Sequence, residues 1–166
     1  MQQSDLSLNN GCSVNLRNLR NNKNNQRGAI IRNNKFSGSY NNHGVFFENS
    51  SAFLGDCEIS NNGIDGVHVR GPWDAKSEPA WCEPSPSVCT GTGGGERLGV
   101  AIENCVIKKN RENGVCIEEF DGSTEIEKTN ISENRTGVLA CGMSASIFIS
   151  SESANDSRAF ASAKAG

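Results

Sequence analysis

The sequence predicts an all-β chain folded as a single-stranded right-handed parallel β-helix, a solenoid of about four to five coils with one long loop inserted. Three observations predict it. A block of roughly 22 residues recurs along the chain. Each copy contains two short segments in which apolar and polar residues alternate, which is the period of a strand and not of a helix. Between these segments lie Gly, Asn, Asp and Ser, the residues that favour tight turns.

The repeat begins at a Gly-Val pair. GVFFENSSAFLGDCEISNN, which starts at Gly44, aligns with GVCIEEFDGSTEIEKTNISEN, which starts at Gly114, when an insertion is allowed. A third copy starts as GVHVR at Gly66, is interrupted, and resumes as GVAIENCVIKKN. A fourth starts as GVLAC at Gly137 and fades after SIFIS. Gly44 and Gly66 are 22 residues apart, and Gly114 and Gly137 are 23 apart, so one turn of chain takes about this length.

A unit this short cannot bury its own apolar face, so it must stack on its neighbours with like residues above one another. The stacking predicts inward columns of apolar side chains, each contributing about 1.5 to 3 kcal/mol on burial. The expected columns are Val45, Val67, Val115 and Val138; Phe47, Val69, Ile117 and Ala140; Leu54, Ile102 and Ile126; and Ile59, Ile107 and Ile131. A ladder of amide hydrogen bonds is expected from Asn62, Asn110 and Asn134, which recur at one turn.

The period divides the chain into three parts. Residues 1–27 are expected to be an N-terminal coil or an irregular lead-in, residues 28–150 the β-helix, and residues 151–166 a disordered tail. Near the start of the β-helix, Ala29, Ile31 and Phe36 match the second strand of the unit. The same stretch, GAIIR, can equally be the first strand, so the register before Gly44 stays open.

Composition and charge exclude several classes of function. The chain has 166 residues and a formal net charge of −3 at pH 7, which argues against nucleic acid as a partner. No run of about 20 apolar residues occurs, so no membrane span is expected. The start, MQQSDLSLNN, has neither a basic nor an apolar signal region, which favours an intracellular location.

The cysteines do not predict a metal centre. There are seven of them without any C-x-x-C spacing, and the chain has only two histidines, so no metal and no cofactor are expected. Free thiols in a reducing compartment are the simplest interpretation. Six residues separate Cys82 from Cys89 within one loop, and whether the two form a disulfide stays open.

The insertion, residues 71–97, is the first candidate for recognition. It contains all four prolines and both tryptophans of the chain. Loops longer than about 12 to 15 residues are uncommon unless they are functional or disordered. Trp73 and Trp81 in such a polar loop predict a partner surface or a sugar-stacking platform. The alternative is that both indoles fold back onto the flank of the coil.

The outward positions of the first strand are the second candidate. Phe46, His68, Cys116 and Leu139 are expected to form an exposed stripe, in which Phe46, His68 and Leu139 are the candidate binding residues. Glu48, Arg70 and Glu118 run beside it and are expected to pair across the strands. This face is either a salt-bridged solvent surface or a groove for a sugar chain or a peptide.

A catalytic alternative uses the same face. Glu48 and Glu118 would be two coils apart, about 9 to 10 Å between backbones, near the upper limit for the two carboxyl groups of an inverting glycosidase. His68 is a candidate base. Arg70 counts against catalysis, because a neighbouring cation lowers the pKa of a carboxyl group and a general acid needs it raised.

The blocks GV-h-h-E and I-E-x-C/N-x-I-x-x-N, where h is an apolar residue, resemble the right-handed β-helix repeats of carbohydrate-binding and sugar-hydrolase (CASH) proteins. That group includes NosD-like periplasmic proteins and the β-helix region of F-box substrate receptors. The resemblance covers Ala29 to Ser150 without the insertion, and implies the pectin-lyase-like fold. The catalytic motifs of pectate lyases, polygalacturonases and alginate epimerases are not found in this sequence.

The sequence therefore predicts a non-catalytic β-helix module that binds a protein partner or a polysaccharide and forms part of a longer protein. The alternative is a polysaccharide lyase or glycoside hydrolase, with Glu48, Glu118, His68 and Arg70 as its candidate catalytic residues. End-to-end association of copies is a further expectation, because neither end carries an amphipathic cap over its open strand edges.

Overall fold

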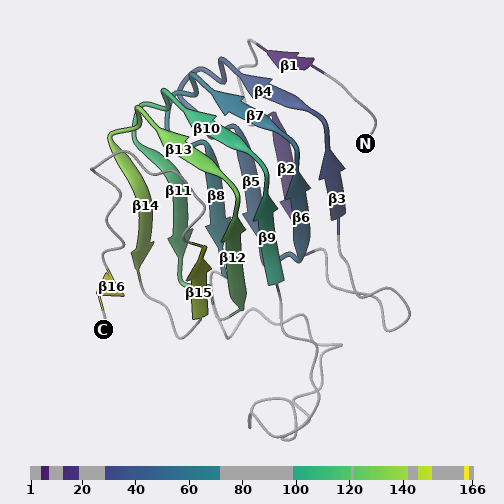
Figure 1. Ribbon diagram of the computed structural model, residues 1–166, viewed down its shortest axis with the longest axis vertical. Coiled ribbons are helices and arrows are strands. Elements are labelled where there is room, and N and C mark those ends of the chain that lie inside the picture. The colour runs from purple at the N-terminus through teal and green to yellow at the C-terminus, as the bar shows by residue number, and fades with distance from the viewer. Residues whose placement is uncertain are drawn as a thin grey trace, which may run out of the picture.

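The structure, a computed structural model, describes residues 5–7, 13–18, 29–71, 99–120, 122–141, 146–150 and 163–164. Every regular element in these ranges is a strand, and the strands form three sheets in which all pairings are parallel (Figure 1). The described residues include no helix of the length and apolar character that crossing a membrane would require.

We number the sheets by the order in which they first appear. Sheet I contains, in order, β1 (Asp5–Ser7), β4 (Lys35–Ser37), β7 (Glu58–Ser60), β10 (Val106–Lys108) and β13 (Asn130–Ser132). Sheet II contains β2 (Val14–Arg17), β5 (Val45–Glu48), β8 (Val67–Arg70), β11 (Asn113–Glu118), β14 (Thr136–Cys141) and β16 (Ala163–Lys164). Sheet III contains β3 (Ala29–Arg32), β6 (Ala52–Gly55), β9 (Gly99–Glu103), β12 (Ser123–Glu127) and β15 (Ser146–Ile149).

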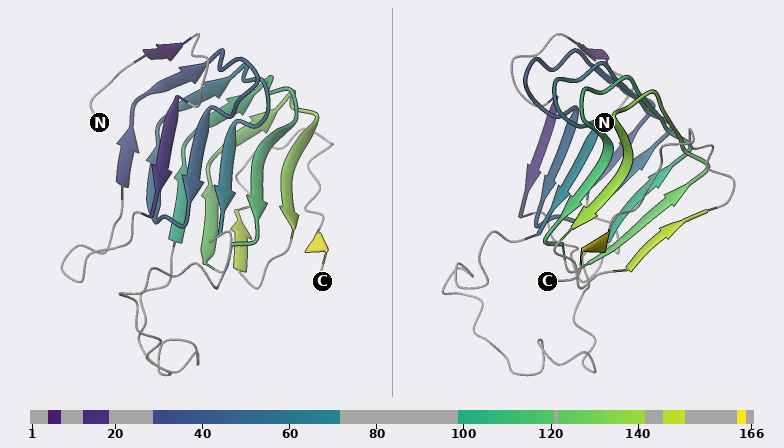
Figure 2. Two further views of the ribbon diagram at one scale, coloured as in Figure 1. Left: turned by 180° about the vertical axis from the view of Figure 1, so that it is seen from behind. Right: turned by 90° about the vertical axis from the view of Figure 1, so that its left-hand side faces the viewer.

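The chain visits the sheets in a fixed order, from sheet II to sheet III to sheet I, and then starts the next turn (Figure 2). This stacked parallel arrangement is compatible with a parallel β-helix. It corrects one expectation, because each turn has three strands and not two alternating segments. The second segment splits between Gly55 and Glu58 into strands of different sheets, β6 and β7.

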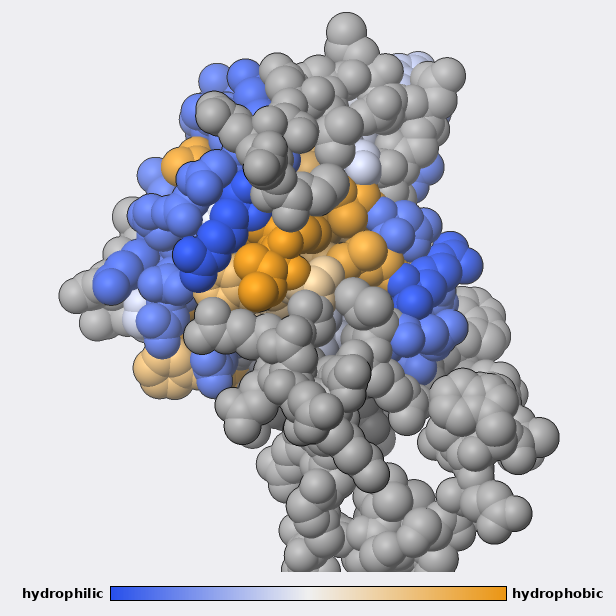
Figure 3. Space-filling view, turned by 90° about the vertical axis from the view of Figure 1, so that its right-hand side faces the viewer, coloured by the Kyte–Doolittle hydropathy of each residue, from blue (hydrophilic) through white to orange (hydrophobic). Residues whose placement is uncertain are grey.

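The expected inward columns are confirmed. Val45 pairs with Val67, Val67 with Val115, and Val115 with Val138 in sheet II, and the four side chains are at most 1% exposed. The column that contains Phe47 is buried in the same sheet, and the Leu54 and Ile59 columns are buried in sheets III and I. Figure 3 views the end of the stack where β2 and β3 lie, and shows apolar residues between hydrophilic flanks.

The corners between strands are made by residues in the left-handed conformation. Eleven non-glycine residues have φ between 47° and 56°, and all but Asn41 directly follow a strand. After sheet III they are Asn33, Asp56, Asn104 and Lys128; after sheet I, Asn61, Lys109 and Glu133; and after sheet II, Asn18, Asn49 and Glu119. Asn and Asp tolerate this conformation better than other non-glycine residues, which explains why asparagines recur between the strands.

The asparagine ladder is confirmed at the corner from sheet I to sheet II. Asn62 Nδ2 donates to Asn110 Oδ1, and Asn110 Nδ2 donates to Asn134 Oδ1, both at 2.9 Å. The ladder and the neighbouring isoleucine column leave no room for a side chain at the repeated glycines. A Cβ on Gly66 would lie 2.8 Å from Asn110 Nδ2 and 2.6 Å from Ile107 Cγ2, too close for any side chain.

The start of the chain takes part in the stack. β1 and β2, within the expected lead-in 1–27, pair with β4 and β5. The open register of GAIIR is settled, because Ala29 pairs with Ala52 and Ile31 with Leu54, which makes it a second strand. In the tail, β16 pairs with β14. The residues around β16 lie outside the described ranges, so the disorder expected for 151–166 stays a prediction there. The insertion from Pro72 onward also lies outside the described ranges.

Candidate functional site

The outward stripe on sheet II has the expected register but not the expected exposure. Phe46 pairs with His68, His68 with Cys116, and Cys116 with Leu139. Phe46 and Leu139 are half-buried, whereas His68 is only 7% and Cys116 only 2% exposed. The rings of His43 and Phe46 lie against the ring of His68, with centroids 4.4 and 5.2 Å away, and help to cover it. The stripe is therefore not a continuous exposed surface.

His68 belongs to a cluster that the sequence analysis missed. Its Nδ1 lies 2.9 Å from Asp65 Oδ2, and His43 Nδ1 lies 3.0 Å from the same oxygen. The other oxygen of Asp65, Oδ1, accepts hydrogen bonds from the backbone N and from Nδ2 of Asn113, at 3.0 and 2.7 Å. His43, Asp65 and Asn113 occupy the same place before the Gly-Val pair in successive turns. That alignment was the available signal for this cluster.

Asp65 remains ionised in this environment. Its side chain is only 3% exposed, and burial by itself raises the pKa of a carboxyl group. The imidazoles of His43 and His68 and the amide groups of Asn113 outweigh burial and hold the pKa of Asp65 well below its usual value. The cluster therefore contains a buried negative charge with two imidazoles against it.

The second nitrogen of His68 faces the neighbouring strand. Its Nε2 lies 3.6 Å from Glu118 Oε2. Cys116 is the register partner of His68 on that strand, and its Sγ is 3.8 Å from Glu118 Oε1. Burial, followed by the charges of Asp65 and Glu118, raises the pKa of the Cys116 thiol, so it stays protonated at neutral pH.

The proposed catalytic carboxylates are engaged in different contacts. Glu48, Arg70 and Glu118 do lie in one register across β5, β8 and β11. Glu48 Oε2 is 3.1 Å from Nε of Arg17 on β2, whereas Glu118 faces His68. Trp73 and Trp81, the candidate binding residues of the insertion, lie outside the described residues.

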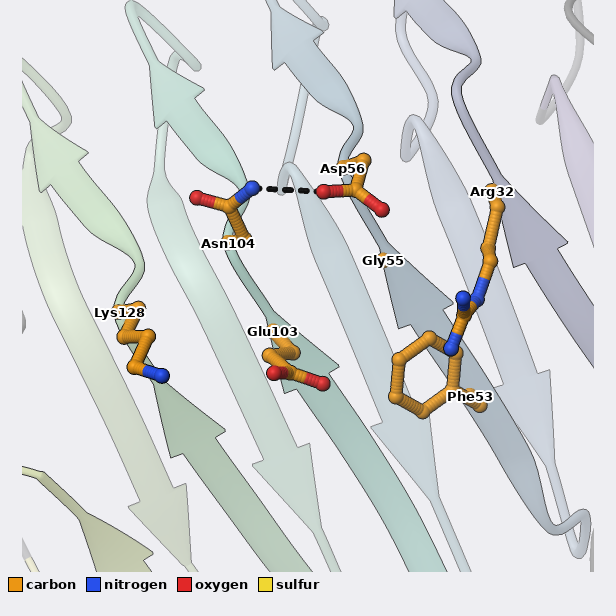
Figure 4. Close-up of a pocket in the computed structure, with 7 residues that line it drawn as sticks. All are labelled: Arg32, Phe53, Gly55, Asp56, Glu103, Asn104 and Lys128. Atoms are coloured by element: carbon orange, nitrogen blue, oxygen red, sulfur yellow. Dashed lines mark hydrogen bonds between the residues drawn. The ribbon is translucent and has the colours of Figure 1, made fainter.

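A groove on the outer face of sheet III is a second feature that the sequence analysis missed. It has a volume of about 330 Å³ and crosses several turns of the stack (Figure 4). Its lining residues are Arg32, Phe53, Gly55, Asp56, Glu103, Asn104 and Lys128. Asp56, Asn104 and Lys128 are corner residues with left-handed backbone, so the same column that bends the chain supplies polar side chains to the groove.

The floor of the groove contains an aromatic ring that lies over a glycine. A Cβ on Gly55 would be 2.4 Å from Phe53 Cε1, so only glycine lets the ring adopt this position. The Arg32 guanidinium lies 4.5 Å from the centre of the ring (Figure 4). At the next turn, Asn104 Nδ2 donates to Asp56 Oδ1 at 2.6 Å. The groove thus combines one aromatic ring with carboxylate, amide and cationic groups.

No protein-family model, curated protein or solved structure matches this chain. Its function is therefore inferred from the residues of these two sites.

Proposed function

We propose that the chain is a non-catalytic module with a right-handed CASH-type β-helix of about four to five coils, and that it binds a glycan in the groove on sheet III. Right-handedness is supported by the general rule that about 98% of crossovers between parallel strands of one sheet are right-handed. Glycan binding is inferred from the chemical character of the residues that line the groove.

Sugars present closely spaced hydroxyl groups that both donate and accept hydrogen bonds, together with apolar C–H faces. Asp56 and Glu103 supply acceptors, Arg32 and Lys128 supply donors, and Asn104 supplies both. Phe53 adds apolar surface. Binding pockets that place a few such polar groups beside an aromatic ring can fix a polar ligand in one orientation.

The repeat gives the groove a direction. Asp56, Asn104 and Lys128 belong to one corner column on adjacent turns, and adjacent strands are about 4.8 Å apart. A linear polymer that lies along the stack would meet polar groups at this regular interval. This spacing favours a polysaccharide over a single small molecule.

The structure offers less support to the lyase or hydrolase alternative. A pair of catalytic carboxylates must both face one bond of the substrate. Glu48 is held by Arg17 on one side, and Glu118 faces the buried ring of His68. We therefore assign recognition, and not bond cleavage, to the chain.

The test is a binding panel of pectin, alginate and neutral polysaccharides, measured by affinity electrophoresis and calorimetry on the whole chain. We expect at least one polysaccharide to bind without release of shorter products. Arg32→Ala and Glu103→Gln should each weaken binding by about 10-fold or more, because a hydrogen bond to a charged group contributes about 1.5 to 3 kcal/mol.

Matched controls are Arg111→Ala and Glu112→Gln, which change exposed residues of the same types outside the groove. They should bind as the unmodified chain does. Binding that is equally weakened by both pairs, or absent from the whole panel, would refute the groove. Release of unsaturated or reducing products would instead show catalysis.

A further inference from the structure

We propose that His43, Asp65 and His68 form a binding site for one divalent transition-metal ion of the Zn²⁺ class, on the outer side of sheet II. This site is independent of the groove on sheet III. No metal was expected from the sequence, because it has no C-x-x-C spacing and only two histidines. The structure brings together the only two histidines of the chain, from two successive turns, around one carboxylate.

The distances suit a single ion. The Nδ1 atoms of His43 and His68 lie 3.0 and 2.9 Å from Asp65 Oδ2, and all three atoms are within 4.8 Å of one another. Bonds of about 2.0 to 2.1 Å to a tetrahedral Zn²⁺ place ligand atoms roughly 3.3 Å apart. The two contacts to Asp65 Oδ2 are within a few tenths of an ångström of that spacing, and the two imidazoles would close around the ion from a separation of at most 4.8 Å.

A second observation comes from His43. Its Nδ1 is buried and lies 3.0 Å from Asp65 Oδ2, without the geometry of a hydrogen bond. This contact is an ion pair only if His43 is protonated, whereas the Nδ1 lone pair of a neutral imidazole is repelled by a carboxylate oxygen unless a cation lies between them. A metal ion between the two side chains would give this nitrogen its partner.

The surrounding residues hold the ligands in the way that is usual around metal ions. Ligating histidines commonly direct their second nitrogen to a carboxylate, and His68 Nε2 faces Glu118 Oε2 at 3.6 Å. Asn113 donates two hydrogen bonds to Asp65 Oδ1, which leaves Oδ2 for the ion. The Phe46 ring, stacked on His43 with centroids 5.7 Å apart, supplies an apolar wall.

The ligand set selects the class of ion. Imidazole nitrogen suits Zn²⁺, Co²⁺, Ni²⁺ and Cu²⁺, whereas Ca²⁺ and Mg²⁺ prefer sets made entirely of oxygen. Three protein ligands leave one tetrahedral position for water or for an oxygen atom of another molecule. His68, Cys116 and Glu118 are also close enough to one another to hold an ion, so the test must distinguish the two groups.

The test uses the whole chain after treatment with a chelator. Co²⁺ is titrated while its visible absorption is recorded, Zn²⁺ is titrated by calorimetry, and bound metal is counted by elemental analysis. We expect one equivalent to bind, with the spectrum of four-coordinate Co²⁺ and without a thiolate-to-cobalt band. The Nδ1 resonances of both histidines should shift when Zn²⁺ is added to ¹⁵N-labelled chain.

Variants then assign the ligands. His43→Gln should weaken Zn²⁺ binding by about 100-fold or more, since the loss of a residue that only orients a ligand, as Asn113 would, typically costs about 10- to 100-fold. His43 is the more exposed histidine, with 16% of its side chain accessible, so this variant should keep the fold, which circular dichroism checks. Cys116→Ser is the matched control and should bind Zn²⁺ normally.

Three results would overturn the proposal. One is the absence of Co²⁺ and Zn²⁺ binding at 1:1 stoichiometry in the unmodified chain. Another is unchanged affinity in a folded His43→Gln variant. The third is a thiolate band that disappears in Cys116→Ser, which would assign the ion to the neighbouring group. None of these results bears on glycan binding, because the groove shares no residue with this cluster.

Discussion

The left-handed corner residues explain much of the unusual composition of this chain. Six of the eleven are asparagine and one is aspartate, whereas Lys109, Glu119, Lys128 and Glu133 are ordinary residues in the same conformation. For such residues the left-handed region costs about 1 to 2 kcal/mol, and asparagine relieves part of that cost through local hydrogen bonds. The corners at these four positions are therefore less stable than the same corners would be with asparagine.

Glu119→Asn should increase the free energy of unfolding by about 0.5 to 1 kcal/mol, because asparagine tolerates φ near 48° better than glutamate does. Urea denaturation followed by circular dichroism measures the change. Glu125→Asn is the control, since Glu125 is an exposed residue of β12 in extended backbone, where asparagine is disfavoured. An equal gain in both variants would contradict the explanation from backbone conformation.

At the same scale, the sequence identified candidate residues better than it identified their surroundings. The register of Phe46, His68 and Cys116 followed from the repeat, because parallel strands align like positions. The burial of His68 did not follow, because it depends on the ring of His43, which precedes the strand and has no place in the alternating pattern. Phe53 was overlooked as well, because its position over Gly55 depends on three-dimensional contact and not on periodicity.

Each element of the stack is held by contacts with the equivalent element one turn away. The asparagine ladder is the polar example, because the Asn110 amide accepts from Asn62 on one side and donates to Asn134 on the other. Asn110 Oδ1 also accepts from the backbone N of Asn62, at 3.1 Å. The ladder therefore satisfies backbone and side-chain groups at a buried corner that would otherwise lack partners.

Asn110→Ala should lower the free energy of unfolding by about 3 kcal/mol, because it leaves buried donors of Asn62 unsatisfied and each such group costs about 1 to 3 kcal/mol. Asn130→Ala changes an exposed asparagine at the start of β13 and should cost less than about 0.5 kcal/mol. Chemical denaturation compares the two. Similar losses in both variants would mean that the ladder contributes nothing specific.

The number of strands per turn was harder to predict than the columns. Cys57 lies at the corner between β6 and β7, and Cys105 at the corner between β9 and β10. Both are buried, so the hydrophobic pattern continues through these corners without a break. Each thiol bonds the carbonyl two residues back, that of Gly55 or Glu103, which closes a tight bend. Thr129 does the same at the next turn. Periodicity alone gave no sign of these bends.

At the scale of the whole molecule, the insertion joins two strands that need only a short connection. Three residues, 49–51, join β5 to β6, whereas the equivalent connection between Arg70 and Val100 has 29. Closing a longer loop costs more entropy, by about 0.6 kcal/mol per doubling of its length. The insertion is therefore not required by the geometry of the stack.

Replacing residues 72–98 by a single serine restores the three-residue spacing. We expect the shortened chain to keep its β-type circular dichroism and to gain about 2 kcal/mol in stability by thermal or chemical unfolding. It lacks both Trp73 and Trp81, so it also tests the proposed contact role of the insertion. Loss of glycan binding with an intact fold would move recognition from the groove to the tryptophans, and loss of the fold would show that the stack depends on the insertion.

The three parallel sheets have a mechanical consequence. Among the described strands, those of each turn pair only with strands of the turns on either side, and β2 and β15 lie at opposite ends of the stack. A force applied between these ends would act on the layers of hydrogen bonds in series, so every layer would carry the full force and the weakest would break first. Resistance to pulling would then be set by the weakest layer and would not grow with the number of layers.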